Sequence, residues 1–244
     1  MRRRFFVEQF DGDSAVLRGD TAEHLGRVLR AQPGQLYELS DGERVWLGRI
    51  EQVALSKRGD NRIEFALVQP IEAHEAALAI QILLSIVKFD RFEWCLEKAT
   101  ELGVMEIIPL GAARTDKPLL AAAGKRHARW EKIIAESAQQ SRRVRPPALA
   151  DTVTSDIAFA NCAAPCKIIL SERREAPPLR ETLASCGRIT AAALAFGPEG
   201  GWSDEELAAA HARSFAAASL GENILRTETA VIAALSVLRF AASA

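Results

Sequence analysis

The chain has 244 residues, 48% of them hydrophobic and 26% charged, which is enough to bury the core of one large domain or two modest ones. No apolar run reaches the length of a membrane span, so we expect no membrane-crossing segment. The net charge of −1 argues against a protein that coats nucleic acid indiscriminately.

The first seven residues are basic and then apolar, but they include neither a sustained apolar core nor a cleavage site. A signal peptide needs both, so we expect a cytoplasmic protein. From there to about residue 70, short β-forming runs are bounded by Gly, Asp or Asn, which favours a small barrel or sandwich. The expected strands are 5–7, 14–17, 35–40, 45–50 and 62–68. One short helix is expected at 20–29, before the turn at Pro33-Gly34.

The pattern changes between residues 70 and 75, where we place a domain boundary. An almost continuous apolar run at 79–87 predicts a strand that is buried on both faces. A helix capped by Asp90 should follow as far as residue 102, because Gly103 is a favourable stop. The next buried strand is expected at 104–110. A strand, a helix and a strand of these lengths form a βαβ unit, which implies a parallel sheet.

A further helix is expected at 126–141, and it leads into a basic turn. Nine basic side chains against three acidic ones lie between residues 114 and 145. This excess is what a footprint for a phosphate backbone would look like, and a solvated helix face explains it equally well.

Two strand–loop–helix units follow a short strand at 167–170. Their strands are expected at 191–196 and 215–220, and their loops at 197–201 (GPEGG) and 220–229. Glycine lets the main chain approach a ligand closely. Either loop alone is explained by a tight turn, but two such loops at the carboxyl ends of neighbouring strands favour a ligand pocket, because open α/β sheets bind ligands at that edge.

The helices that follow these loops have recognisable starts. Ser203 and Glu206 have the spacing of a capping box, so the first helix should begin at Asp204. The second is expected at 230–240, with Thr227 or Thr229 as its cap.

The cysteines and histidines do not form a pattern that predicts a metal site. Cys162 and Cys166 are four residues apart, but no second pair or nearby histidine completes a zinc site. The sequence also lacks a Walker A loop, a dinucleotide-binding glycine fingerprint and a serine nucleophile elbow. We therefore expect a glycine-rich pocket without a metal.

Three segments together resemble one family: KATELGV at 98–104, GPEGG at 197–201 and LRTETA at 225–230. On these the chain is similar to the RsmE family, bacterial enzymes of the SPOUT superfamily that use S-adenosylmethionine to methylate N3 of one uridine in 16S ribosomal RNA. HLGRVLR at 24–30 also resembles the start of that family's N-terminal domain. The resemblance implies a PUA-like RNA-binding β-barrel at 1–72 and a SPOUT-type trefoil-knotted α/β methyltransferase domain at 73–244. It also implies a homodimer that acts on the small ribosomal subunit.

The resemblance further implies that three loops hold the cofactor. The expected cofactor-binding residues are Leu170, Ser171, Phe196, Gly197, Pro198, Glu199, Gly200, Gly201, Leu220, Gly221, Ile224, Leu225, Arg226 and Thr229. The basic residues expected to bind RNA are Arg27, Arg30, Lys88, Arg114, Arg142, Arg143 and Arg145.

Arg226 and Arg143 are the candidate catalytic residues. Uracil N3 carries a proton at neutral pH, and its loss leaves negative charge on the base that a guanidinium would stabilise. Arg226 is the first choice because it lies inside a cofactor loop, and an ion pair with Glu199 or Glu228 is its structural alternative. The same two carboxylates are candidates for the general base.

The chain departs from the family pattern at one segment. The family has E-Q-[SC]-G-R where this chain has Gln139-Gln140-Ser141-Arg142-Arg143, so Gln139 cannot accept a proton. Ala112-Ala113-Arg114 likewise replaces the family's Ser-Glu-Arg. Two alternatives stay open: a SPOUT methyltransferase that acts on transfer RNA or another base, and an inactive RNA-binding adaptor.

Overall fold

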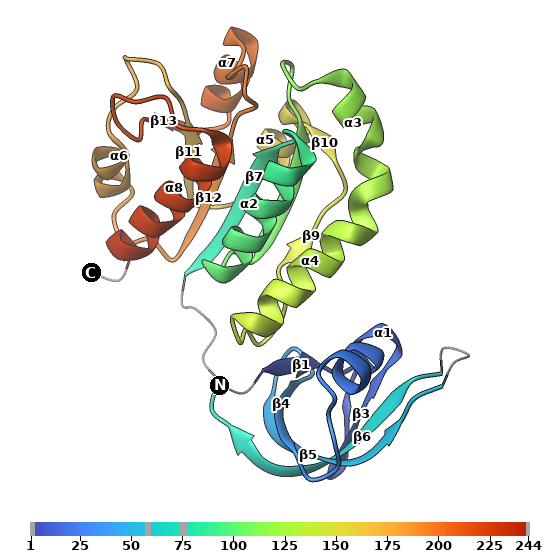
Figure 1. The fold of residues 1–244 in the computed structure, drawn as a ribbon. Helices are drawn as coiled ribbons and strands as arrows, with labels where there is room; N and C mark the ends of the chain where they lie inside the picture. The colour runs from blue at the N-terminus through green and yellow to red at the C-terminus, as the bar shows by residue number, and fades with distance from the viewer. Residues whose placement is uncertain (1–2, 57–59, 74–77, 243–244) are drawn as a thin grey trace. The chain divides into compact units, whose positions relative to one another are not determined.

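The computed structural model describes three stretches of the chain: 3–56, 60–73 and 78–242. The chain divides into two compact units (Figure 1). One contains Met1–Glu75 with Ala138–Pro146, and the other contains Ala76–Ser137 with Pro147–Ala244. None of the helices in the described stretches combines the length and hydropathy that a membrane crossing demands.

The first unit is built on a six-stranded sheet in the order β1-β4-β5-β6-β3-β2. Its strands are β1 (Arg4–Phe6), β2 (Phe10–Asp11), β3 (Ser14–Arg18), β4 (Leu36–Ser40), β5 (Val45–Ala54) and β6 (Arg62–Ile71). β1 runs parallel to β4, and the other neighbours are antiparallel. The edge strands β1 and β2 are not paired with each other within the described residues, so the sheet is a half-barrel. All five strands expected from the sequence are present.

The helix expected at 20–29 is present, but its geometry changes along its length. α1 (Gly19–Glu23) continues into a π-helical segment, His24–Val28, in which the backbone N–H of Leu29 donates to the carbonyl of His24. Leu25 is fully buried and belongs to the same core as Phe5 and Phe65. The sequence predicted a helix here, whereas a π-helical turn has no sequence signal of its own.

Residues Ala138–Pro146 pack with the first unit through a buried carboxylate. Glu38 accepts hydrogen bonds from Arg4 Nη2 at 2.9 Å and from the guanidinium of Arg142. Arg4 Nη1 also donates to the carbonyl of Arg142 at 2.6 Å, and the hydroxyl of Ser40 donates to the carbonyl of Val144. Arg142 has a φ of 57°, a conformation that glycine adopts most easily. Its ion pair to Glu38 offsets that steric cost.

The second unit is built on a seven-stranded parallel sheet, as expected from the βαβ pattern. The strand order is β10-β8-β7-β12-β11-β13, and β9 pairs with β8. The strands are β7 (Ala79–Ser85), β8 (Glu106–Gly111), β9 (Ala148–Leu149), β10 (Val153–Thr154), β11 (Cys166–Leu170), β12 (Ala191–Phe196) and β13 (Ala216–Ala218). The chain passes from β11 to β12 and then back to β13, on the other side of β11.

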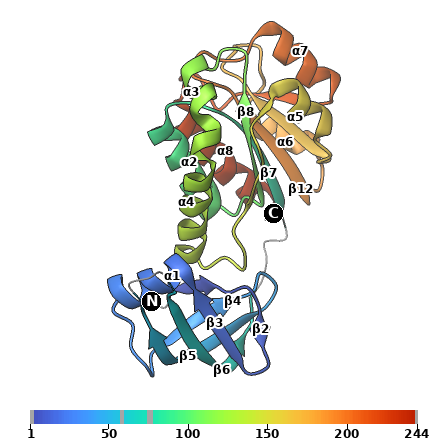
Figure 2. The ribbon, with the colours of Figure 1, turned by 90° about the vertical axis from the view of Figure 1, so that its right-hand side faces the viewer.

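Helices cover both faces of this sheet. They are α2 (Phe89–Glu101), α3 (Lys117–Ala123), α4 (His127–Gln140), α5 (Ser155–Asn161), α6 (Leu179–Ser185), α7 (Asp204–Ala212) and α8 (Thr227–Ala242). Figure 2 shows α5 and α7 on one side and α2, α4 and α8 on the other. Along β7, Ile82 and Leu84 belong to the core under α2 and α8, and Leu83 belongs to the core under α5 and α7. This alternation explains why the central strands are apolar throughout.

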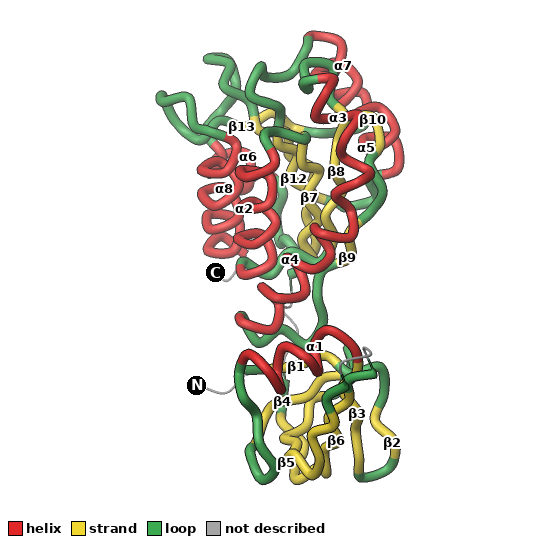
Figure 3. Tube along the Cα trace, turned by 45° about the vertical axis from the view of Figure 1, so that its right-hand side comes forward, coloured by secondary structure: helices red, strands yellow, loops and turns green. Residues whose placement is uncertain are grey.

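The helix starts differ in detail from the sequence expectations. α7 begins at Asp204 behind the expected capping box, in which Ser203 Oγ accepts from the N–H of Glu206 at 3.1 Å. α2 has Lys88 as its N-cap, so Asp90 is not the cap and lies instead in the first turn, where its charge favours the helix dipole. α8 begins at Thr227, three residues before the expected start. α2 and α8 pack side by side (Figure 3).

Candidate functional site

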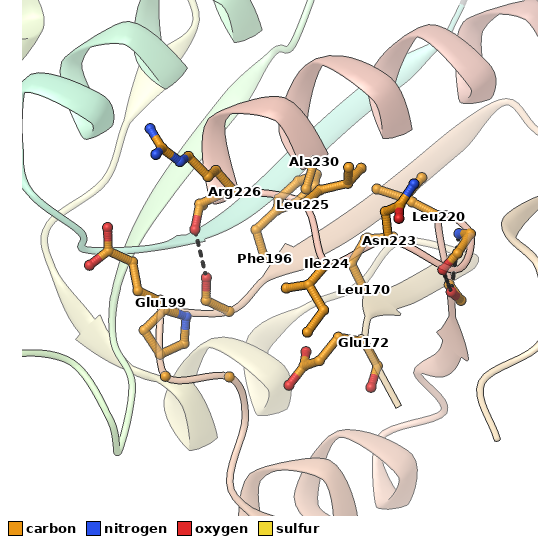
Figure 4. Close-up of a pocket in the computed structure, with 18 of the residues that line it drawn as sticks. Leu170, Glu172, Phe196, Glu199, Leu220, Asn223, Ile224, Leu225, Arg226 and Ala230 are labelled. Atoms are coloured by element: carbon orange, nitrogen blue, oxygen red, sulfur yellow. Dashed lines mark hydrogen bonds between the residues drawn. The ribbon is translucent and has the colours of Figure 1, made fainter. Parts of the chain in front are cut away.

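The carboxyl ends of β7, β12, β11 and β13 lie next to one another in the second unit, and the segments that leave them line one cavity (Figure 4). Its volume is about 600 Å³, which is within the range of small-molecule sites. The contributing segments are the start of α2, residues 170–172, residues 196–201, and residues 218–227 with Ala230. A cavity at this edge of a parallel sheet is where ligands bind in open α/β folds.

The glycine-rich loop follows β12, whose last residue, Phe196, is buried. The N–H of Gly201 donates to the carbonyl of Pro198 at 2.9 Å and closes a tight turn. Gly201 has a φ of 70°, and a Cβ there would overlap the carboxylate of Glu172. At Gly197 a Cβ would lie 3.1 Å from the Trp202 ring. A side chain at either position would therefore crowd its neighbour, and at Gly201 it would also be strained by the positive φ.

The second loop runs from Ser219 to Arg226 and meets the first. Gly221 has a φ of 124°, and its N–H donates to Ser219 Oγ at 3.2 Å. Thr227 Oγ1 donates to the carbonyl of Gly197 at 3.4 Å, drawn as a dashed line in Figure 4. Ile224 is 82% exposed and presents apolar surface at the cavity.

The third segment follows β11. The carbonyl of Leu170 accepts from Trp202 Nε1 at 2.9 Å, and the N–H of Ser171 donates to the carbonyl of Ala218 at 2.9 Å. These bonds tie the segment to the other two loops. Glu172 lies beside the glycine-rich loop and also lines the cavity.

Thirteen of the fourteen residues expected to bind the cofactor line this cavity: Leu170, Ser171, Phe196, Gly197, Pro198, Glu199, Gly200, Gly201, Leu220, Gly221, Ile224, Leu225 and Arg226. The other, Thr229, lies on the exposed surface of the first turn of α8. The LRTETA motif assigned Thr229 to the site because a sequence motif does not show where the loop ends and the helix begins, or which helix residues face solvent.

Arg226 is exposed and lines the cavity at the point where the second loop becomes α8. The sequence suggested an ion pair between Arg226 and Glu199 or Glu228, but in the structure both carboxylates pair with Arg91. Arg91, in the first turn of α2, pairs with Glu199, and its Nε lies 3.9 Å from Glu228 Oε1. Arg91 was not among the residues expected at the site. Its position just after a buried parallel strand is the feature of the sequence that could have identified it.

Two of the basic residues expected to bind RNA lie in the second unit. Lys88 lines the cavity, and Arg114 Nη1 donates to the carbonyl of Gly200 at 2.8 Å. Arg114 thus contacts the glycine-rich loop from outside.

The other five lie in the first unit. Arg27 pairs with Glu23 at 2.8 Å, and Arg142 pairs with Glu38. Arg30 has a φ of 52° and is exposed. Arg143 and Arg145 belong to the turn that follows α4.

The buried thiols are poorly suited to nucleophilic chemistry. Burial, and secondarily the charge of Glu228, raises the pKa of Cys95 to about 12. Burial likewise raises the pKa of Cys166 to about 12, with a hydrogen bond to Cys186 adding to the shift. Such thiols stay protonated at neutral pH. The described residues contain no group of three metal-binding side chains.

Comparison with known proteins shows what this chain is similar to. Residues 74–239 match the family of RNA methyltransferase domains. The "Ribosomal RNA small subunit methyltransferase E" of Synechocystis sp. is 31% identical over 94% of this chain and 74% of its own length. The Bacillus subtilis protein of the same name is 27% identical over 98% of this chain and 96% of its own.

Solved structures agree over nearly the whole chain. A "Ribosomal RNA small subunit methyltransferase E" from Neisseria gonorrhoeae, bound to S-adenosylmethionine, superposes with a TM-score of 0.85 at 29% identity and covers 98% of both chains. A putative methyltransferase from Legionella pneumophila, also in complex with that cofactor, gives a TM-score of 0.85 at 31% identity and covers 99% of this chain and 98% of its own.

Proposed function

This chain belongs to the ribosomal RNA small subunit methyltransferase E family, and we propose on that premise that it transfers a methyl group from S-adenosylmethionine to N3 of a uridine in 16S ribosomal RNA. The observation that carries the proposal is the cavity at the carboxyl edge of the parallel sheet, formed by the glycine-rich loop and the loop that ends in Arg226. A substrate in ribosomal RNA implies a cytoplasmic enzyme.

The lining of the cavity fits S-adenosylmethionine. Leu170, Leu225 and Ala230 provide apolar surface for an adenine ring, and the three glycines of residues 197–201 leave main-chain groups accessible to polar parts of the cofactor. Lys88 supplies positive charge for the carboxylate of the methionyl part. When bound, the cofactor supplies a methyl group that its sulfonium already activates.

The protein's contribution is to orient the uracil, exclude water and stabilise charge. Alignment of two reactants in a closed site lowers a barrier by roughly 7–11 kcal/mol. Removal of the N3 proton leaves an anionic base, and the exposed guanidinium of Arg226 at the cavity is our first choice to stabilise that anion. Arg143 is the second choice.

The carboxylates differ in their suitability as a proton acceptor. Glu228 is 8% exposed and does not line the cavity, and its charge acts on Cys95 within the core. Glu199 lines the cavity but is paired with Arg91. These contacts disfavour Glu228 as the base and leave both carboxylates paired with Arg91.

We further propose that the first unit, with Arg27, Arg30, Arg143 and Arg145, is a PUA-like domain that binds RNA phosphates. The return of the chain from β12 past β11 to β13 is compatible with the trefoil knot of SPOUT enzymes. A homodimer is supported by exposed apolar side chains on one face of α8, where Val237 is 38% and Phe240 is 82% exposed.

The experiment that tests this function uses small ribosomal subunits from cells that lack the protein. Incubation with the purified enzyme and labelled S-adenosylmethionine should place one methyl group on N3 of one uridine, detected by mass mapping of 16S RNA fragments. Label in transfer RNA alone, or no label despite cofactor binding, would contradict the proposal.

A further inference from the structure

Arg91 contacts two carboxylates that come from different segments of the chain, and of these two only Glu199 lines the cavity. Its guanidinium pairs with Glu199, in the glycine-rich loop, and its Nε lies 3.9 Å from Glu228, in the first turn of α8. Its side chain is 26% exposed and itself lines the cavity. Glu199 and Arg226 lie at the same end of the cavity (Figure 4).

Glu228 needs a positive neighbour. Its side chain is 10% exposed, and its Oε2 is buried and accepts no hydrogen bond from the described part of the chain. A buried carboxylate without a cation is strongly unfavourable. The planar guanidinium of an arginine has donors on several sides, so Arg91 can serve Glu228 and Glu199 at once, which the point charge of a lysine cannot do equally well.

We propose that Arg91 is a positioning residue that holds the glycine-rich loop at a set distance from the start of α8, and so keeps the two cofactor loops in the geometry that S-adenosylmethionine requires. The inference rests on the proposed function. Arg114 also contacts the same loop, through its hydrogen bond to the carbonyl of Gly200. Preorganisation of this kind increases affinity because the loop loses less freedom when the ligand binds.

A direct contact between Arg91 and the cofactor would also make Arg91 important for binding. A double-mutant cycle distinguishes this direct contact from an effect that Arg91 exerts through Glu199. The Kd for S-adenosylmethionine is measured by calorimetry for the wild type, Arg91→Ala, Glu199→Ala and the double variant. If Arg91 acts through Glu199, each single change raises Kd about tenfold and the double change raises it by no more than the larger single effect. If the two effects multiply, Arg91 acts on its own and the inference is overturned.

Two further variants keep the test decisive. Arg91→Ala leaves Glu228 buried without its cation, so Arg91→Ala combined with Glu228→Gln removes that charge and preserves folding while the glycine-rich loop is still released. This double variant should also bind S-adenosylmethionine with a Kd about tenfold higher than that of the wild type. Arg91→Lys retains a charge opposite Glu199 and should recover part of the affinity, and no recovery would count against the loop contact.

The matched control is Arg129→Ala. Arg129, in α4, makes two hydrogen bonds of 2.8 Å to Glu93, which lies on α2 as Arg91 does, and neither Arg129 nor Glu93 lines the cavity. The Kd of the Arg129→Ala variant for S-adenosylmethionine should equal that of the wild type. A wild type that does not bind S-adenosylmethionine overturns the proposed function together with this inference, whereas a wild type that binds and an Arg91→Ala variant that binds equally well overturn the inference alone.

Discussion

Arg226 is the residue on which the proposed chemistry depends most. We expect Arg226→Ala to reduce the single-turnover rate of methylation about 10²- to 10³-fold, because the anionic uracil then loses its principal positive neighbour. The measurement is a rapid-quench assay at saturating cofactor and RNA. Arg226→Lys should keep part of the rate, since it retains the charge.

Arg143→Ala is the comparison for that experiment. If Arg226→Ala leaves the single-turnover rate intact and Arg143→Ala abolishes it, the catalytic role belongs to Arg143 in the basic turn.

Cys95 makes stability depend on pH in the alkaline range. Its pKa is about 12 in the folded protein, against about 8.5 in an unfolded chain, so above the unfolded value the unfolded state loses a proton that the folded state keeps. Stability should therefore fall with rising pH between about 9 and 12, by up to about 1.4 kcal/mol per pH unit for this thiol.

Urea unfolding at pH 7 and pH 10.5 measures this effect. Cys95→Ala should lose less stability between the two pH values than the wild type does. Equal losses in both proteins would show that the thiol does not carry the effect.

The glycine-rich loop provides a prediction at the scale of an element. Gly201→Ala places a Cβ against Glu172 and imposes a φ of 70° on a residue with a side chain. We expect a loss of about 1 kcal/mol of stability and a marked increase in the Kd for S-adenosylmethionine, because the loop must move into or away from the cavity. Thermal unfolding and calorimetry measure the two effects.

Gly187→Ala is the control for the loop variant. Gly187 has a φ of 65°, but its Cβ would meet nothing within 4 Å and it lies outside the cavity lining. It should lower stability by a similar amount and leave the Kd unchanged. An increased Kd for Gly187→Ala would mean that stability, and not the loop, determines binding.

The elements that could be predicted from sequence are those with a strong local signal. The apolar runs 79–87 and 191–196 identified two strands of the buried sheet, observed at Ala79–Ser85 and Ala191–Phe196, and the capping box at Ser203 identified the start of α7. α3, α5 and α6 were not expected, because helices of seven residues have too few turns for a hydrophobic period to appear.

The parts of the site that escaped prediction depend on tertiary contacts. The two glycine loops were visible as motifs, but the pairing of Arg91 with Glu199 joins residues 108 positions apart. The ion pair between Glu38 and Arg142 spans 104 positions in the same way. Local patterns carry no information about such pairs, so Arg91 was missed and Arg142 was assigned to RNA without regard to Glu38.

At the scale of the whole molecule, each unit has its own core and its own proposed task. The second unit holds the cofactor cavity, and we assign RNA binding to the first unit. The most direct test of the account is therefore methyl transfer itself. Purified protein and labelled S-adenosylmethionine are incubated with small ribosomal subunits from cells lacking the protein, and the 16S RNA is mapped by mass spectrometry. We predict one methyl group on N3 of a single uridine, formed about 10²- to 10³-fold more slowly with Arg226→Ala. Methylation of a different class of RNA, or of a different position in 16S RNA, would contradict the proposed function.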